Sequence, residues 1–365
     1  MKKWLFRIGI GIFIIFLALV GFIFYGETDE AFVTEHIKNE NLKTVKDDWK
    51  GTPLDQKERF VNVEHPFLPS TLELLKWQLS SNKFSEEKKN DKQRLKVLDP
   101  ADFLNSEKDG ILWLGHASIY IRLKGKTILI DPVFGEPAFV KRFVEVPNPI
   151  TKIKDVDYVL LTHDHRDHCD ETTLKQLAKK FPNAVFLGGL RMDELFKDWT
   201  NNKNETGNAG WYQQFELNDE NLKITFVPVR HWSRRGLFDT NHRLWGGFVI
   251  ESGDTKIYHG GDSGYGSHYK ELGETFGEID YFIVGIGAYE PRWFMKANHN
   301  NPADVVRAFQ DAKAKFLIPM HYGTFDLSDE PPGQPLRLLK QEAEKAGVSE
   351  KIRVLQINES LILSK

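Results

Sequence analysis

The sequence predicts an α/β fold, because apolar runs with the length and composition of β-strands recur along the chain and close at a histidine or an aspartate. The run 156–162 is rich in valine and leucine. In the segment 170–181 that follows it, apolar residues recur at helical spacing behind an aspartate suited to an N-cap. Similar runs lead to His231, Asp262 and His321. Since each run closes at such a residue, we expect side chains from separate strands to converge in one cleft.

The amino terminus is predicted to span a membrane. Residues 8–25 are almost wholly apolar, and with the preceding aromatic residues they are long enough to cross a hydrocarbon core at about 1.5 Å per residue. Lys2, Lys3 and Arg7 precede the run, and such a positive flank is expected to stay in the cytoplasm. No convincing signal-peptide cleavage site follows. We therefore expect 1–26 to be a transmembrane signal-anchor of a single-pass cell-membrane protein, with the remaining chain outside the cytoplasm.

Residues 27–108 are predicted to form a linker and amino-terminal extension. Their first half is polar and charged, and residues 86–96 form a charged run typical of a solvated loop or an exposed helix. The segment 70–79 places Leu72, Leu75, Trp77 and Leu79 among polar residues. This pattern fits a helix that lies on a membrane surface, and it fits a helix that packs on the rest of the protein.

Residues 109–365 are predicted to form one α/β domain, because strand-like runs follow one another without an obvious linker. The domain begins with strands expected at 110–114, 118–123 and 127–131, the last two joined by a turn at a Lys-Gly-Lys sequence. Asp131 closes the third strand, directly before a proline. It is either a strand-end residue or a partner that orients a metal-binding histidine, and we favour the second.

The most informative stretch of the chain is the sequence His-Asp-His-Arg-Asp-His at residues 163–168. It places several strong metal-ligand side chains on a short connection between a strand and a helix, where they can point at one position. Imidazole and carboxylate ligands without thiolate suit zinc, with iron or manganese as poorer competitors. The single cysteine, Cys169, excludes an internal disulfide, and it is expected to be a small buried residue rather than a metal contact.

This histidine and aspartate pattern, followed by the later candidate ligands in the same chain order, resembles that of the metallo-β-lactamase-fold hydrolases. The resemblance implies an αββα sandwich and a site for two Zn²⁺ ions. One ion would be held by His163, His165 and His231, the other by Asp167, His168 and His321, and Asp262 would bridge them.

Several further segments resemble N-acyl-phosphatidylethanolamine-hydrolysing phospholipase D, over about residues 58–347. The most discriminating is the sequence Tyr-Glu-Pro-Arg-Trp-Phe-Met at 289–295. The resemblance implies a zinc-dependent phosphodiesterase that cleaves N-acyl phosphatidylethanolamine, or a related phospholipid in the bilayer, to phosphatidic acid and an N-acylethanolamine. His299 is then the candidate for a protonated residue near the leaving group. His116 is either an active-site or a structural histidine, and Arg292 either contacts phosphate or pairs with a carboxylate.

Other functions remain as alternatives. A related metallo-hydrolase could act on another phosphodiester or on a lactone, since metal ligands alone do not choose between phosphorus and a carbonyl carbon. A zinc-binding membrane protein without turnover is disfavoured, because no expected ligand is missing. The formal net charge of −3 and the lack of a basic tract in the domain argue against a nucleic-acid substrate. The oligomeric state is left open.

Overall fold

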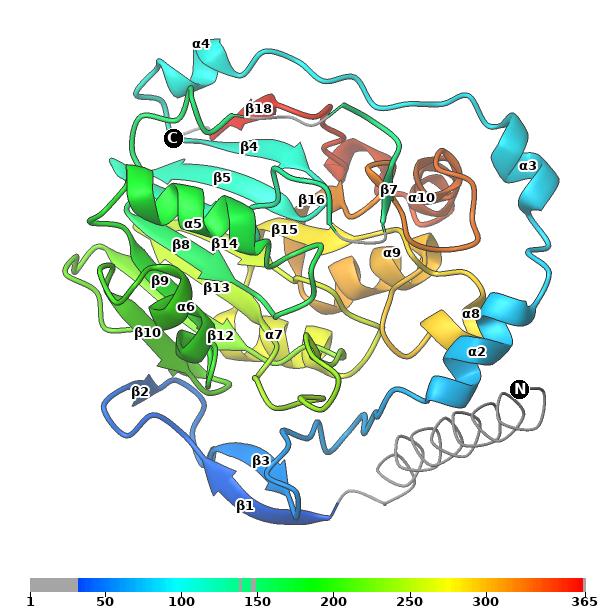
Figure 1. Cartoon of the computed structure of the whole chain (residues 1–365). Helices are drawn as coiled ribbons and strands as arrows, with labels where there is room; N and C mark the ends of the chain where they lie inside the picture. The colour runs from blue at the N-terminus through cyan, green and yellow to red at the C-terminus, as the bar shows by residue number, and fades with distance from the viewer. Residues whose placement is uncertain (1–31, 138–139, 146–148, 364–365) are drawn as a thin grey trace, which may run out of the picture.

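In the computed structural model (Figure 1), residues 32–137, 140–145 and 149–363 are described. Two seven-stranded sheets stack face to face between two layers of helices. The predicted αββα arrangement is therefore confirmed for this part of the chain. The structure offers no test of the domain boundaries proposed at 26 and 108.

The first sheet has the strand order β10-β9-β8-β6-β5-β4-β18. Its antiparallel part, β4 to β6, matches the strands expected at 110–131, and its parallel part, β6 to β10, carries the metal-ligand sequence behind β8. The strands are β4 (Gly110–Gly115), β5 (Ser118–Leu123), β6 (Lys126–Ile130), β8 (Tyr158–Leu161), β9 (Val185–Gly189), β10 (Thr206–Ala209) and β18 (Glu359–Ile362).

The second sheet has the order β16-β15-β14-β13-β12-β11-β2. It is antiparallel from β2 to β14 and parallel from β14 to β16. The strands are β2 (Lys43–Thr44), β11 (Gln213–Gln214), β12 (Leu222–Val227), β13 (Gly247–Ser252), β14 (Thr255–His259), β15 (Ile279–Gly285) and β16 (Ala314–Met320). Because β2 pairs with β11, part of the amino-terminal extension belongs to this sheet.

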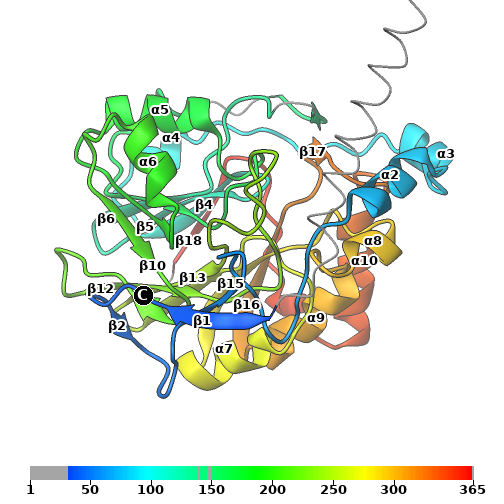
Figure 2. The same cartoon turned by 60° about the horizontal axis from the view of Figure 1, so that its bottom comes forward.

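Helices cover the outer faces of both sheets (Figures 1 and 2). The first sheet carries α5 (Glu171–Lys180), which begins where the Asp170 carboxylate accepts the N–H of Thr173 at 3.0 Å, as the sequence predicts. α4 (Ala101–Leu104) and α6 (Asp193–Trp199) lie on the same side. The second sheet is covered by α7 (His268–Phe276), α9 (Pro302–Asp311) and α10 (Gln334–Lys345).

The remaining elements are short and lie at the periphery. They are β1 (Val33–Ile37), β3 (Thr52–Asp55), β7 (Lys141–Arg142), β17 (Phe325–Asp326), α2 (Thr71–Leu79), α3 (Ser85–Asn90), α8 (Arg292–Met295) and the 3₁₀ turn Ser349–Lys351.

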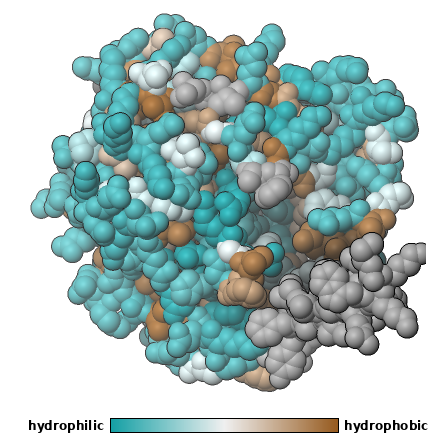
Figure 3. All heavy atoms as spheres, viewed as in Figure 1, coloured by the Kyte–Doolittle hydropathy of each residue, from teal (hydrophilic) through white to brown (hydrophobic). Residues whose placement is uncertain are grey.

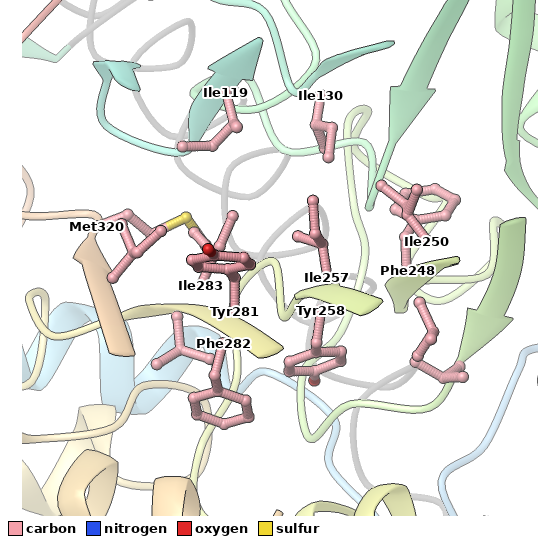
Figure 4. Close-up of a cluster of buried hydrophobic side chains, with 14 of the residues drawn as sticks. Ile119, Ile130, Phe248, Ile250, Ile257, Tyr258, Tyr281, Phe282, Ile283 and Met320 are labelled. Atoms are coloured by element: carbon pink, nitrogen blue, oxygen red, sulfur yellow. The ribbon is translucent and has the colours of Figure 1, made fainter. Parts of the chain in front are cut away.

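The core between the sheets follows from strand alternation (Figure 4). Ile119 and Ile130 of the first sheet point towards Phe248, Ile257 and Ile283 of the second, and all five side chains are fully buried. Residues at the intervening positions point to the opposite face and contact the helices. The sheets are thus held in register by close apolar packing, which fixes where their strand ends meet.

The predicted transmembrane helix and the single-pass location in the cell membrane are corrected by the structure. Among the described residues, no helix is long and apolar enough to cross a bilayer. The longest described helix, α10, has 12 residues; at about 1.5 Å per residue it rises about 18 Å, against a hydrocarbon core of about 30 Å. The segment 1–26, whose hydropathy alone suggested the anchor, lies outside the described residues.

Truncation of the inter-sheet core should be strongly destabilising. Phe248→Ala removes a fully buried ring and should lower the free energy of unfolding by about 3–5 kcal/mol, because the packed sheets can only partly close the cavity. Ile250→Val, on the same strand, should lower it by only about 1 kcal/mol. Urea denaturation followed by circular dichroism measures both values. Equal losses would mean that this ring is not part of the tightly packed core.

Candidate metal centre

The candidate metal ligands all follow the carboxyl ends of strands. Residues 163–168 follow β8, and His231, Asp262 and His321 come after β12, β14 and β16. The two stacked sheets bring these ends together, so that all seven predicted ligands lie in one group, in which five are buried and His165 and Asp167 are partly exposed. The structure therefore places them close to one another, while their roles as ligands remain predictions.

Three imidazoles form the first cluster. The His165 Nδ1 atom lies 3.0 Å from Nε2 of His163 and 3.1 Å from Nε2 of His231. Tetrahedral zinc with Zn–N bonds of about 2.0–2.1 Å places its nitrogen ligands about 3.3 Å apart. The spacing of the three rings is therefore close to that of a zinc triad.

The second cluster contains Asp167, His168 and His321, and the structure adds His116 to it. The Asp167 Oδ2 atom lies 3.7 Å from Nε2 of both His168 and His321, and 3.0 Å from Nε2 of His116. The His116 ring centroid is also only 3.9 Å from that of His321. Of the two alternatives left open for His116, the geometry favours a place in the site, as a partner of the Asp167 carboxylate.

Asp262 lies between the two clusters. One carboxylate oxygen, Oδ1, is 3.0 Å from Nε2 of His321, whereas Oδ2 is 3.2 Å from Nε2 of His168 and 3.8 Å from Nε2 of His231. Asp262 is therefore the one predicted ligand that faces both clusters, which is the position that a bridging carboxylate requires.

Several predicted ligands have buried nitrogen or oxygen atoms without a hydrogen-bond partner, and such atoms could bind a metal ion. In the described part of the chain, Nε2 of His168, Nε2 of His321 and Oδ1 of Asp262 are buried without a hydrogen-bond partner. Buried polar atoms are rarely left so. These atoms lie close together but are not aligned for hydrogen bonds, so their lone pairs converge on shared positions instead of on each other. Such convergence of nitrogen and carboxylate oxygen atoms suits a divalent cation.

Asp131 orients His168 from outside the ligand group. Its Oδ2 atom lies 2.8 Å from Nδ1 of His168 and accepts the Thr162 hydroxyl at 2.6 Å, and Oδ1 accepts the Thr162 N–H at 2.8 Å. The carboxylate thus holds the end of β8 and directs Nε2 of His168 into the site, the arrangement expected of a carboxylate behind a ligand histidine. Thr162, which the sequence analysis did not single out, adjoins the motif directly.

Burial and neighbouring charges divide the histidines into two groups. Burial lowers the pKa of His163 and His231 well below the usual value, and that of His165 to about 4, so these rings are neutral near pH 7. Burial also opposes charge on His321, but the Asp262 and Asp167 carboxylates raise its pKa to about 9. Because metal ligands must be deprotonated, a cation in the second cluster would have to displace a proton from His321.

His299 lies beside the predicted ligands, and Arg292 takes up one of the two roles left open for it. The Nδ1 atom of His299 lies 3.8 Å from Oδ2 of Asp262, so this residue borders the site. However, burial lowers the pKa of His299 to about 4, below the neutral range expected for it. Arg292 pairs with Asp304 at 2.7 Å and donates to the carbonyl of His299 at 3.0 Å. It therefore pairs with a carboxylate and fixes the backbone of His299.

Two other residues of the motif region turn away from the site. Asp164 forms an ion pair with Arg243 at 3.1 Å, and Cys169 is fully buried in the apolar cluster beneath α5. Cys169 is thus the small core residue that the sequence predicts.

Glu330 supports the site from a position that sequence reasoning missed. Its buried carboxylate accepts backbone N–H groups of Ala288 at 2.6 Å, Tyr289 at 3.3 Å and Glu290 at 3.0 Å. These residues begin the segment that leads to α8 and His299. No local pattern around residue 330 indicates this contact, because its partners lie about forty residues away in the chain.

Comparisons with known proteins agree with the observed fold. Residues 126–322 match the β-lactamase superfamily domain. The chain is 33% identical over 228 residues to N-acyl-phosphatidylethanolamine-hydrolyzing phospholipase D 1 of Caenorhabditis elegans, covering 59% of this chain and 64% of that protein. It is 31% identical over 214 residues to a metal-dependent hydrolase of Caldivirga maquilingensis, covering 58% of this chain and 82% of that protein.

Among solved structures, a possible metal-dependent hydrolase from Veillonella parvula superposes with a TM-score of 0.57 at 17% identity, covering 70% of this chain and 100% of that one. This likeness supports the fold. The chain spans slightly less than two thirds of the length of the nematode phospholipase.

Removal of the Asp131 charge should weaken metal binding. In Asp131→Asn the neutral amide is a weaker hydrogen-bond acceptor for Thr162 and for the His168 ring, so we expect metal affinity to fall about 10–100-fold. Competition with a chromophoric chelator measures the affinity. Asp164→Asn is the matched control, since Asp164 faces Arg243 instead of the site, and its affinity should stay close to that of the unmodified protein. An equal loss in both variants would contradict the orienting role of Asp131.

The Glu330 carboxyl should make stability depend on pH. Burial raises the pKa of this group in the folded protein, so the unfolded chain loses the proton first as pH rises above about 4.5. Stability from this group is therefore present at low pH and lost as pH rises through the folded pKa. Glu330→Gln should not show this loss. Its free energy of unfolding, measured by urea titration and compared with that of the unmodified protein, should therefore rise with pH. A constant difference across pH would contradict the raised pKa.

Proposed function

The chain belongs to the β-lactamase superfamily of metal-dependent hydrolases, and we propose that it is a zinc-dependent phosphodiesterase acting on N-acyl phosphatidylethanolamine or a related phospholipid. The products would be phosphatidic acid and an N-acylethanolamine. The observation that carries the proposal is the position of Asp262 between two ligand clusters. The similarity to the nematode phospholipase supports the choice of substrate.

Two Zn²⁺ ions are the proposed cofactors. His163, His165 and His231 would hold one, and Asp167, His168 and His321 the other, with Asp262 shared between them. When bound, such ions lower the pKa of water and neutralise charge on phosphoryl oxygens. Iron or manganese would also accept these nitrogen and oxygen ligands, and the softness of imidazole favours zinc.

The protein's own residues prepare the site for a charged substrate. The three rings of the first cluster are neutral near pH 7, so their lone pairs are free for a cation. Asp131 keeps His168 in one orientation, and Arg292 keeps the backbone of His299 in place. Positions fixed in this way reduce the reorganisation that the reaction would require.

His299 is proposed to contact the leaving-group oxygen as a neutral ring. It lies at the edge of the site with part of its side chain exposed, where a departing alcohol would pass. Because its pKa is lowered to about 4, the ring would donate a hydrogen bond at neutral pH instead of carrying a full positive charge. The proton that completes the alcohol would then come from solvent.

The reaction can be tested by isotope labelling. In heavy-oxygen water, attack at phosphorus puts the new oxygen into phosphatidic acid, while the broken P–O bond leaves the N-acylethanolamine unlabelled. Mass spectrometry of both products, after incubation with N-acyl phosphatidylethanolamine, measures this distribution. Label in a free fatty acid would show acyl hydrolysis, and turnover of a lactone but of no phosphodiester would assign the protein to a different branch of the superfamily.

Metal content tests the dinuclear assignment. We expect about two equivalents of metal per chain, from the ligand sets of the two clusters. Asp262→Asn should lower this content and abolish turnover, because a neutral amide is a poor bridge between two cations. Elemental analysis of the purified protein gives the value. One equivalent with full activity would contradict a two-metal site.

A further inference from the structure

Helix α2 has two faces with different surroundings. On one, the Trp77 ring packs against Phe294 of α8 with centroids 5.2 Å apart, and its N–H donates to Asp329 at 3.1 Å. On the other, Leu72, Leu75 and Leu79 are 62%, 43% and 86% exposed. Of the two alternatives left by the sequence, the structure thus supports packing on the domain, while in the described part of the chain the leucine face stays exposed.

The leucine face is a continuous apolar stripe. Positions 72, 75 and 79 follow the i, i+3, i+7 spacing of one side of a helix. Trp293 of the neighbouring α8 adds a ring that is 49% exposed. In Figure 3 brown side chains gather over α2 and α8 on the face towards the viewer. A cluster of large exposed apolar side chains, as opposed to single ones, marks an interaction surface.

A second apolar projection lies on the same face. The segment between β12 and β13 carries Leu237, which is 80% exposed, and Figures 1 and 2 both show this segment and α2 on one side of the molecule. His231 lies near the start of this segment, and the ring of the next residue, Trp232, lies 4.6 Å from that of His165. α8 leads to His299. Both apolar projections are therefore continuous with the walls of the metal centre.

Basic side chains border the leucine face. Lys76 on α2 lies 4.7 Å above the Trp293 ring, and Lys296 at the end of α8 is exposed. The Lys83 side chain is 66% exposed, although its ammonium group pairs with Glu290 at 3.3 Å. Glu73 is the acidic residue of α2. Apolar side chains flanked by lysines suit the boundary between acyl chains and anionic headgroups.

We propose that the leucine face of α2, with Trp293 and Leu237, docks the protein on an anionic phospholipid surface. Docking on these side chains would turn the metal centre towards the headgroups. The proposal rests on the proposed function for the identity of the surface, because a phospholipid substrate lies in such a surface. It uses no spanning segment: the contact is made by side chains of the folded domain.

Site-specific fluorescence tests the docking directly. Cys169 is fully buried, so a cysteine introduced as Leu75→Cys or Leu237→Cys can be labelled with a polarity-sensitive fluorophore in the full-length chain. With vesicles of phosphatidylcholine and phosphatidylglycerol, both labels should shift to shorter wavelength and be quenched by a nitroxide-labelled lipid. Lys270→Cys on α7, a position with a 73% exposed side chain, is the control and should not respond.

The outcomes separate the possible occupants of the face. The proposal would be overturned if the protein binds the vesicles and the labels at 75 and 237 nevertheless keep the emission spectra that they have in water. Labels whose emission is already at shorter wavelength in buffer would show that the face is covered without lipid. The cover would be residues 1–31 if the protein is monomeric, and a second copy of the chain if it is not. Either result also overturns the proposal.

A substitution series separates docking from chemistry. In Leu72→Ser/Leu75→Ser/Leu79→Ser, hydrolysis of a vesicle substrate relative to a water-soluble phosphodiester should fall at least about tenfold. The matched control is Val97→Ser/Leu98→Ser/Ile362→Ser, exposed apolar residues near the β4–β18 edge, and its ratio should not change. Equal losses on both substrates would assign α2 to folding. If the unmodified protein hydrolyses neither substrate, the proposed function fails, while the fluorescence labels still decide the docking.

Discussion

Burial of ionisable side chains between the sheets is the constraint on which the rest of the site depends. Asp131, His168 and Asp262 are almost completely buried, and an isolated charge in such surroundings would be strongly destabilising. Each carboxylate therefore faces imidazole nitrogen: Asp131 lies 2.8 Å and Asp262 3.2 Å from the two nitrogens of the same ring, His168. The compensation is mutual, and it leaves lone pairs directed at positions that suit a cation.

This compensation requires the two sheets to hold their strand ends still, and backbone contacts across the sandwich do so. The carbonyl of Thr162 accepts the N–H of Gly246 at 2.9 Å, and the N–H of His321 donates to the carbonyl of His116 at 3.0 Å. Gly261 allows a further close approach, since its φ is 53° and a Cβ there would lie 2.8 Å from Thr162. The candidate metal centre is thus built on paired backbone instead of on free loops, which favours precise positions of the proposed ligands.

The exposed leucines of α2 differ from the core residues in how little they contribute to folding. Leu72, Leu75 and Leu79 of α2 stay largely exposed in the fold, so burial on folding accounts for little of their presence. Trp77 on the same helix, in contrast, packs on α8 and holds α2 in place. A hydrolase whose substrate lies in a lipid phase needs a face of this kind beside its active site. The proposed chemistry and the proposed docking are therefore linked through two segments. One lies between β12 and β13 and carries both His231 and Leu237, and the other runs from α8 to His299.

The sequence by itself determined the features that depend on neighbouring residues. The strands at 110–131 and Ala314–Met320, and the capped helix behind Asp170, follow from periodicity and capping. The motif at 163–168 indicated four of the residues that lie together, and the ends of later strand-like runs indicated the other three, His231, Asp262 and His321. The membrane anchor expected at 1–26 has no counterpart among the described helices, and that segment itself lies outside the described residues.

Only the tertiary structure decided the contacts between distant parts of the chain. The pairing of Arg292 with Asp304, the place of His116 beside Asp167, and the contacts of Glu330 with the segment that begins at Ala288 have no local signal. The lowered pKa of His299 likewise arises from burial. Each depends on how the two sheets stack, because stacking sets which side chains are neighbours and which lose contact with water.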